Sequence, residues 1–283
     1  MSIIKIEGLH FSYPDGTNAL EGINFSVKRS EFVGILGANG SGKTTLLRVL
    51  NGLLKPTQGN VYLSGESLKS IDRNKLFMKA CTVFQNPDDQ LFSPTVSQDI
   101  AFGPANMGLS KEEIKRRVYN ALACVEMSGF EEKAIHNLSY GQKKRICLAG
   151  VLAMGPEIIF LDEPTASLDP MGVSMIMHLL KKLNKEGVTM VMATHSVDLV
   201  PLFLDRVVIL NKGNIVGEGL PEKVFSDPEV IRSAKLRLPQ VGHLFEILKK
   251  KDKFAVNNLP LTIGEARREI LKSVSISKKI ASR

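Results

Sequence analysis

The most constraining feature of the chain is a glycine-rich segment between an apolar run and an amphipathic one. Residues 37–44 read Gly-Ala-Asn-Gly-Ser-Gly-Lys-Thr and match the pattern G-x-x-x-x-G-K-[ST] of a phosphate-binding loop. The segment follows an apolar run at residues 32–36. It precedes a predicted helix with an apolar stripe made of Leu46, Leu47, Leu50 and Leu53. This strand–loop–helix context predicts a P-loop rather than a chance glycine-rich turn.

The chemistry of such a loop depends on backbone N–H groups, which glycines allow to converge on phosphate oxygens. The helix N-terminus adds the positive end of its dipole. Lys43 is predicted to hold the β- and γ-phosphates of a nucleoside triphosphate, and the Thr44 hydroxyl to hold Mg²⁺. The predicted nucleotide contacts are Gly37, Ala38, Asn39, Gly40, Ser41, Gly42, Lys43, Thr44 and Thr45.

Two carboxylates, Asp162 and Glu163, directly follow the apolar run at residues 158–161. Ligands of open α/β sheets bind at the carboxyl ends of strands. Asp162 is therefore predicted to hold Mg²⁺ through water, and Glu163 to act as general base on an attacking water. The alternative is an acidic pair in a solvated turn or helix cap. The P-loop upstream favours the catalytic interpretation.

The remaining pattern predicts an α/β domain with a largely parallel sheet. Strands are predicted at residues 3–6, 23–27, 32–36, 158–161, 189–193 and 207–210. A second helical stripe consists of Ile114, Val118, Ala121, Leu122 and Val125. Ser110 and Glu113 form a capping-box pattern before it. Asp169 and Pro170 are predicted to open another helix, which ends near Gly187.

The composition of the chain excludes some classes of binding partner and leaves others open. The net charge of +8 suits nucleic acid, an anionic membrane, a phosphate-rich ligand or a merely solvated basic surface. Cys81, Cys124 and Cys147 lack metal-ligand spacing, and we expect buried, reduced thiols. The first residues lack a signal-peptide core, and no uncharged stretch approaches the ~20 residues that span a bilayer. We therefore expect any membrane work to go through a partner.

With these motifs in order, the chain resembles an ABC-type ATPase from about residue 3 to residue 224. Residues 138–142 read Leu-Ser-Tyr-Gly-Gln, which is similar to the family signature LSGGQ with Tyr140 in place of a glycine. Ser139 and Gln142 also form a capping-box pattern, which aims a helix N-terminus at an anion. Taken alone, the pentapeptide is better explained as a simple helix cap, and its place between a P-loop and Asp162–Glu163 favours the signature.

The resemblance implies a P-loop NTPase fold of the ABC-type nucleotide-binding domain, in the α/β class. Its parts are a RecA-like core, an antiparallel β subdomain and an inserted helical subdomain, here at about residues 86–156. The expected boundaries are 1–226 for the ATPase domain and 227–283 for a small helical C-terminal appendage. The appendage either packs on its own core or helps to hold two ATPases together.

The resemblance also implies roles for single residues. Tyr13 matches the aromatic residue that stacks on adenine, and residues 167–169 match a loop that communicates across the dimer. The implied catalytic set is Glu163, His195 and Gln85, and the implied metal set is Thr44, Gln85 and Asp162. Taken singly, such polar residues are more often satisfied structural groups. Their order along the chain favours the catalytic roles.

In this family each ATP lies between the P-loop of one subunit and the signature of another. The implied signature contacts are Ser139, Gly141 and Gln142. One chain holds half of each site, so a second ABC ATPase subunit is expected, identical or different. ATP with Mg²⁺ would close the dimer, and hydrolysis would release it.

Residues 84–104 and 138–145 are similar to the energy-coupling-factor group of importers, which take up cobalt, nickel or vitamins. There, the region around Gln85 forms a groove for a transmembrane coupling protein, which works with a small substrate-binding membrane protein. The expected lining is Phe84, Leu91, Phe92 and Phe102, although these side chains are also suited to the subdomain's own core. The expected location is peripheral, at the cytoplasmic face of the cell membrane.

This resemblance implies the ATPase motor of a cobalt or nickel importer. The alternative is the shared ATPase of an importer for vitamins of the riboflavin, biotin, thiamine and folate class. A nucleic-acid-associated ATPase is less favoured, since the chain carries one cassette and no sustained heptads between P-loop and signature. No nucleic acid partner is expected. A non-catalytic regulatory cassette would be expected to lack Glu163 or His195, and both are present.

Overall fold

The computed structural model describes residues 2–254, 256 and 258–281. The strands are β1 (Ser2–Ser12), β2 (Asn18–Lys28), β3 (Phe32–Leu36), β4 (Gln58–Leu63), β5 (Glu66–Ser67), β6 (Ala80–Val83), β7 (Ile158–Asp162), β8 (Thr189–Thr194), β9 (Arg206–Asn211) and β10 (Asn214–Gly219). The helices are α1 (Lys43–Leu50), α2 (Arg73–Lys79), α3 (Val96–Asn106), α4 (Lys111–Cys124), α5 (Tyr140–Met154), α6 (Pro170–Lys185), α7 (Val200–Phe203), α8 (Pro221–Val224), α9 (Pro228–Ser233), α10 (Gln240–Lys251) and α11 (Ile263–Ala281).

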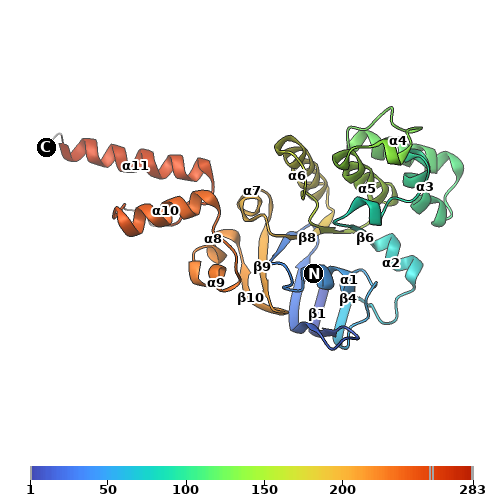
Figure 1. The fold of residues 1–283 in the computed structure, drawn as a ribbon, viewed down its shortest axis with the longest axis horizontal. Helices are drawn as coiled ribbons and strands as arrows, with labels where there is room; N and C mark the ends of the chain where they lie inside the picture. Colours follow the sequence, from blue (N-terminus) through green and yellow to red (C-terminus); the bar gives the residue numbers. More distant parts are fainter. Residues whose placement is uncertain (1, 255, 257, 282–283) are drawn as a thin grey trace.

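Two sheets form the centre of the molecule (Figure 1). The larger has the order β10-β9-β3-β8-β7-β6, in which β10 pairs antiparallel and the other neighbours pair parallel. The smaller has the order β2-β1-β4-β5 and is antiparallel throughout. Every predicted strand is present, and the α/β fold with an antiparallel β subdomain is confirmed.

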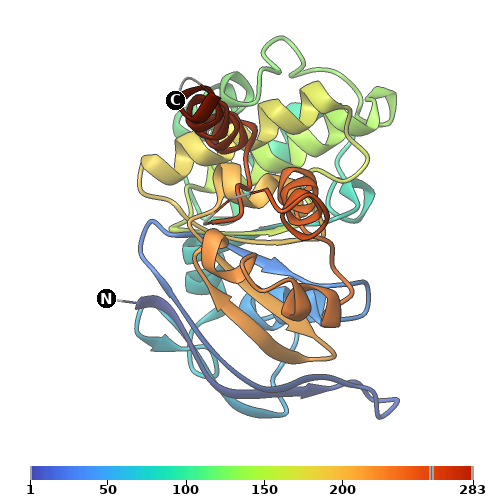
Figure 2. The same ribbon diagram turned by 90° about the vertical axis from the view of Figure 1, so that its left-hand side faces the viewer.

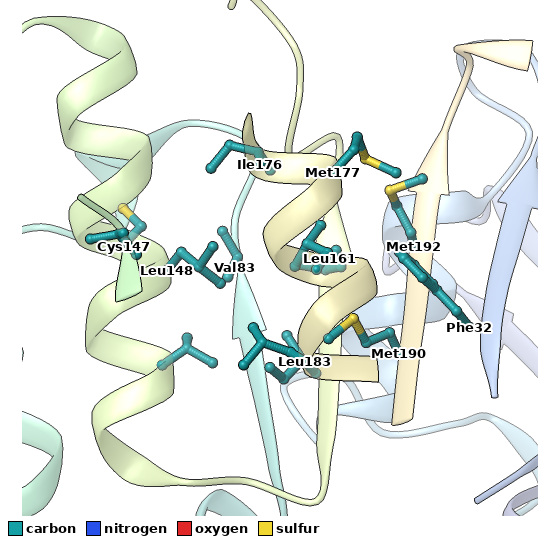
Figure 3. Packing of buried hydrophobic residues seen from close by; sticks show 14 of the residues in the cluster. Phe32, Val83, Cys147, Leu148, Leu161, Ile176, Met177, Leu183, Met190 and Met192 are labelled. Atoms are coloured by element: carbon teal, nitrogen blue, oxygen red, sulfur yellow. The ribbon is translucent and has the colours of Figure 1, made fainter. Parts of the chain in front are cut away.

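The central strands β3, β7 and β8 of the larger sheet are buried on both faces, which explains their continuous apolar runs. Along β7, Ile158 and Phe160 belong to the hydrophobic cluster shared with α1 and the smaller sheet. Ile159 and Leu161 belong to a second cluster, shared with α5 and α6. Figure 3 shows part of this second cluster, including Leu161 of β7, Leu148 of α5 and Ile176 of α6. The period-two alternation therefore divides one strand between two cores.

Helices α3, α4 and α5 lie together at one end of the molecule (Figure 1). The Ser110 hydroxyl accepts a hydrogen bond from the backbone N–H of Glu113, as the capping pattern predicts. The Glu113 carboxylate does not complete the box, because it pairs with Arg116 and Arg117 instead. Cys124 at the end of α4 is exposed, so the prediction that all three thiols are buried was wrong.

Helices α10 and α11 extend away from the sheets in Figure 1 and are seen nearly end-on in Figure 2. The segment before them does not form a separate core, since Ile231, Ala234 and Leu238 are buried in the cluster that also contains α5 and α6. Within the described residues, no helix combines the length and the apolar character that a bilayer crossing requires.

Candidate nucleotide-binding and catalytic site

The glycine-rich loop connects β3 to α1 and depends on glycine at specific positions. Gly42 precedes α1 with φ 106°, in the left-handed region that favours glycine. A Cβ on Gly37 would lie 2.3 Å from Ser41 Oγ and 2.4 Å from the carbonyl oxygen of Leu210. Larger residues would therefore push the loop apart. Gly42 has no side chain with which to cap α1, so the first N–H groups of the helix remain available to an anion.

Lys43 is held inside the loop. Its Nζ donates to the carbonyl oxygens of Gly37 at 2.8 Å and Ala38 at 3.1 Å. Burial lowers the pKa of Lys43, and the nearby charges of Glu163 and Asp162 oppose this shift. The ammonium is thus fixed where phosphate oxygens can replace the two carbonyls.

Two observations test whether these residues fit a nucleotide with Mg²⁺. Among the described residues, Ser41 Oγ is the buried side-chain polar atom that has no hydrogen-bond partner. The Thr44 hydroxyl donates to Asp162 Oδ1 at 3.2 Å, which places two oxygen ligands side by side. Hard cations such as Mg²⁺ prefer oxygen ligands and take the remaining ones from water and phosphate. The loop therefore fits a phosphate with its cation.

Asp162 ends β7 and is buried, so its charge is poorly solvated. Burial raises the pKa of Asp162, while the hydrogen bond from Thr44 lowers it. A divalent cation at this point would favour the ionised carboxylate. Within the part of the chain that the structure describes, no three His, Cys, Asp or Glu side chains gather into a metal site.

Glu163 follows with a strained backbone and a fully engaged side chain. Its φ is 47°, an unusual value for a non-glycine residue. Its Oε1 lies 2.8 Å from His195 Nδ1. Its Oε2 accepts a hydrogen bond from the Thr194 hydroxyl at 3.3 Å. At 5% exposure, the carboxylate is shielded from bulk water, and it can accept a proton from a water at the end of the sheet.

Thr194 is a site residue that sequence reasoning missed. It stands at the carboxyl end of the buried strand β8, directly before His195. Besides its bond to Glu163, its hydroxyl accepts from the backbone N–H of Ser196 at 3.0 Å. A hydroxyl between a buried strand and a candidate catalytic histidine was the available signal.

Tyr13 lies next to the P-loop helix. Its hydroxyl shares a hydrogen bond of 2.9 Å with the Thr45 hydroxyl. The ring packs edge-on against Phe11, with 5.0 Å between the ring centroids. The structure thus places this aromatic residue beside the loop, and its stacking on adenine stays a prediction.

The signature residues lie apart from the P-loop. Ser139 and Gln142 form the predicted capping box at the start of α5. Ser139, Gly141 and Gln142 line a cavity of 570 Å³, and no residue of the P-loop lines it. Its far wall includes Ser167 and Asp169. One chain therefore does not bring the two predicted halves of the nucleotide site together.

The segment around Gln85 contacts α5 rather than the P-loop. The Tyr140 hydroxyl donates to the backbone carbonyl of Gln85 at 3.2 Å. The Gln90 side chain also connects this segment to α5, because it accepts a hydrogen bond from the Phe84 N–H and donates one to the Cys147 carbonyl. The exposed Gln85 side chain makes no hydrogen bond with Thr44 or Asp162, all three of which the structure describes. Its predicted metal role stays a prediction.

An apolar groove of 240 Å³ lies between α3, α5 and the end of α1. Phe84, Phe92 and Phe102 line it, and Phe92 is 65% exposed. Phe92 and Phe102 pack edge to face, with 4.7 Å between their ring centroids. Leu91 is buried in the core instead, so its predicted place in the groove was wrong. Leu53 lines the groove with 53% exposure and does not continue the buried stripe of α1.

Comparisons with known proteins agree with this geometry. The sequence pattern that describes the ABC transporter family matches residues 20–166. The energy-coupling factor transporter ATP-binding protein EcfA of Methanococcus maripaludis is 55% identical over 272 residues, which cover 95% of this chain and 98% of the relative. EcfA of Methanocaldococcus jannaschii is 54% identical over 278 residues, which cover 96% of this chain and 98% of the relative.

Two solved structures resemble the chain as well. One is cbiO1 from Clostridium perfringens, described as part of the ABC transporter complex cbiONQ. It has a TM-score of 0.74 and 48% identity, and covers 87% of this chain and 99% of its own. The other is an ATP-binding cassette in a dimeric post-hydrolysis state with ADP and Pi. It has a TM-score of 0.70 and 32% identity, and the match covers 77% of this chain and 98% of that structure's chain.

Proposed function

Because this chain belongs to the ABC transporter family, among its energy-coupling factor ATP-binding proteins, we propose that it powers the import of cobalt or nickel ions. The observation that carries the proposal is the convergence of Lys43, Asp162, Glu163 and His195 at the carboxyl end of one sheet, in a chain that also has an exposed apolar groove. The first feature supports ATP hydrolysis, and the second supports coupling to a partner.

In the proposed mechanism, Lys43 exchanges the carbonyls of the loop for the β- and γ-phosphate oxygens of ATP. Thr44 and Asp162 hold the oxygen ligand positions for Mg²⁺. The bound cation would neutralise charge on the phosphates. Glu163 accepts the proton of the attacking water, and its carboxylate is oriented by His195 and Thr194.

The proposed active unit is a dimer of ABC ATPase subunits. The separation of the signature cavity from the P-loop supports two composite sites, each completed by the other subunit. We propose Ser139, Gly141 and Gln142 as the contacts to the partner's ATP. A chain ending at Pro239 would test the role of α10 and α11, since it keeps Ile231 in the core. Unchanged nucleotide-free dimerisation would exclude that role.

We propose that the apolar groove receives a coupling helix of a transmembrane protein. Two exposed aromatic rings beside the Gln85 segment give such a helix an apolar seat. The Tyr140 hydroxyl bond to the Gln85 carbonyl then connects this seat to the signature helix. The chain would act at the cytoplasmic face of the membrane, together with a small substrate-binding membrane protein.

The cargo is tested by uptake. Cells that express the chain with its membrane partners are given radioactive cobalt, and the competing solutes are nickel and vitamins of the riboflavin, biotin, thiamine and folate class. We expect cobalt accumulation that nickel reduces, that vitamins leave unchanged, and that Glu163→Gln abolishes. Accumulation of a vitamin without cobalt would replace the cargo and leave the ATPase assignment standing.

A further inference from the structure

A buried lysine on the signature helix is not used by the mechanism above. Lys144 lies in the first turns of α5 and is 2% exposed. Its Nζ donates to the backbone carbonyl oxygen of Glu163 at 2.8 Å. The neighbouring Lys143 behaves differently, since it pairs with Asp88 near the surface at 2.6 Å. Two adjacent lysines thus have different partners, and the buried one contacts the loop that carries Glu163.

The bond meets Glu163 where its backbone is strained. The carbonyl oxygen of Glu163 also accepts from the Ala166 N–H at 3.1 Å, while its own N–H donates to the Ala193 carbonyl at 3.0 Å. These contacts hold a residue with φ 47°. A sparsely populated conformation persists only where surrounding contacts impose it. Lys144 is the side chain that contributes to this hold from a different element of the fold.

Burying an ammonium is costly unless hydrogen bonds compensate it. Burial lowers the pKa of Lys144, and the nearby Cys147, Glu163 and Asp162 oppose the shift. The ammonium also lies 5.8 Å from the centroid of the Tyr140 ring. An apolar side chain of similar length would fill this space without the desolvation cost. The contact with Glu163 is therefore what the charged group adds.

We propose that Lys144 is a positioning residue for Glu163, which it holds by the main chain so that the carboxylate meets the attacking water. This inference rests on the proposed role of Glu163 as general base. It gives the signature helix a direct connection, within one chain, to the backbone of Glu163, the residue that directly follows β7. A shift of α5 when the signature meets the partner's ATP would move the Glu163 backbone with it.

The tight packing of α5 allows a displacement of this helix to reach the elements packed against it. Cys147 and Leu148, on the following turn, lie in the same cluster as Ile176 of α6 and Val83 of β6 (Figure 3). Tightly packed interiors transmit displacement instead of absorbing it. Lys144 then places the polar end of this packed unit on the loop that carries Glu163.

The test compares variants of the full-length chain, assembled with the subunit with which it dimerises. Lys144→Met removes the donor and keeps the stem, and Lys144→Arg keeps a charged donor. Lys115→Met is the matched control, because Lys115 is exposed on α4 of the same subdomain. Glu163→Gln is measured in parallel. The readouts are kcat, KM for ATP, ATP-driven dimerisation and the melting temperature.

We expect Lys144→Met to lower kcat by about 10- to 100-fold, since small misplacements of a catalytic group have effects of this size. KM and ATP-driven dimerisation should change less than about threefold, and Lys144→Arg should recover most of the loss. Lys115→Met should match the unmodified chain. If Lys144→Met does not fold, Lys144→Leu, which also lacks a donor, replaces it under the same criteria.

A kcat for Lys144→Met within about twofold of the unmodified chain, beside an inactive Glu163→Gln, would overturn the positioning role alone. A parallel loss of kcat, ATP affinity and dimerisation that arginine does not restore would overturn it too, since that marks a purely structural lysine. Full turnover by Glu163→Gln would instead remove Glu163 from the general-base role, and the inference with it.

Discussion

Replacing Glu163 by glutamine removes the proposed general base with little change in shape. The amide keeps the size of the carboxylate, and its oxygen can accept from one of the two groups that now contact Glu163, which are His195 and Thr194. Lys43 and Thr44 are unaffected, since their contacts are to the loop and to Asp162. We therefore expect ATP binding to persist and turnover to stop.

The expected loss of rate follows from the role of Glu163 as general base. A positioned general base contributes about 10²- to 10⁴-fold to a rate. At about 1.36 kcal/mol per tenfold, its loss adds roughly 2.7 to 5.4 kcal/mol to the barrier. A loss of this size makes hydrolysis slow compared with ATP binding, so a dimer closed by ATP should accumulate.

The assay combines phosphate release with size-exclusion chromatography in the presence of ATP and Mg²⁺. Glu157→Gln is the matched control, because it makes the same chemical change just before the other end of β7, where Glu157 pairs with Arg29. The control should hydrolyse ATP normally and not accumulate as a dimer. Undiminished phosphate release by Glu163→Gln would refute the assignment.

Three further predictions follow from contacts outside this carboxylate. Phe92→Asp should weaken binding of the membrane partner while changing the free energy of unfolding by no more than about 0.5 kcal/mol, whereas Tyr119→Asp, exposed outside the groove, should leave partner binding unchanged in the same pull-down. The hydrogen bond from Arg232 holds the pKa of Glu246 down to about 2, from an ordinary value of 4.5. The stability that this carboxylate contributes is therefore complete above pH 4.5 and is lost as the pH falls toward 2. Glu246→Gln should flatten that part of a melting profile, and an unaltered acid limb would contradict this. Tyr140→Phe removes the hydroxyl bond to the Gln85 carbonyl and should uncouple ATPase rate from partner binding without lowering ATP affinity, and equal stimulation by the partner in both proteins would count against it.

The sequence predicted the central strands and the P-loop because both depend on local patterns. Strands such as β3 and β7 are buried on both faces, so each is a continuous apolar run that can be recognised from its own sequence alone. Strand β10 was not predicted, because it pairs at the sheet edge with alternating, half-exposed residues. Strand β6 has only four residues directly after α2, too few for a periodic signal.

The errors concern residues whose environment is decided by distant segments. Leu53 and Leu91 are both apolar and adjacent to predicted elements, yet Leu53 is exposed in a groove and Leu91 is buried. Cys124 lies on the exposed side of α4 at its end, although its neighbours Leu122 and Val125 are buried. Lys143 and Lys144 look like one basic run, and only the packing of α5 turns the second inward. Local composition carries no information on such choices.

The central claim, that this ATPase drives a membrane importer, is tested most directly by affinity purification of the chain from native membranes. Mass spectrometry then identifies the proteins that copurify. We expect to recover a second ABC ATPase subunit or a second copy of this chain, a polytopic membrane protein and a small substrate-binding membrane protein. Recovery of ribosomes or DNA, with no membrane protein, would contradict the importer and leave the ATPase chemistry of Lys43, Asp162 and Glu163 in place.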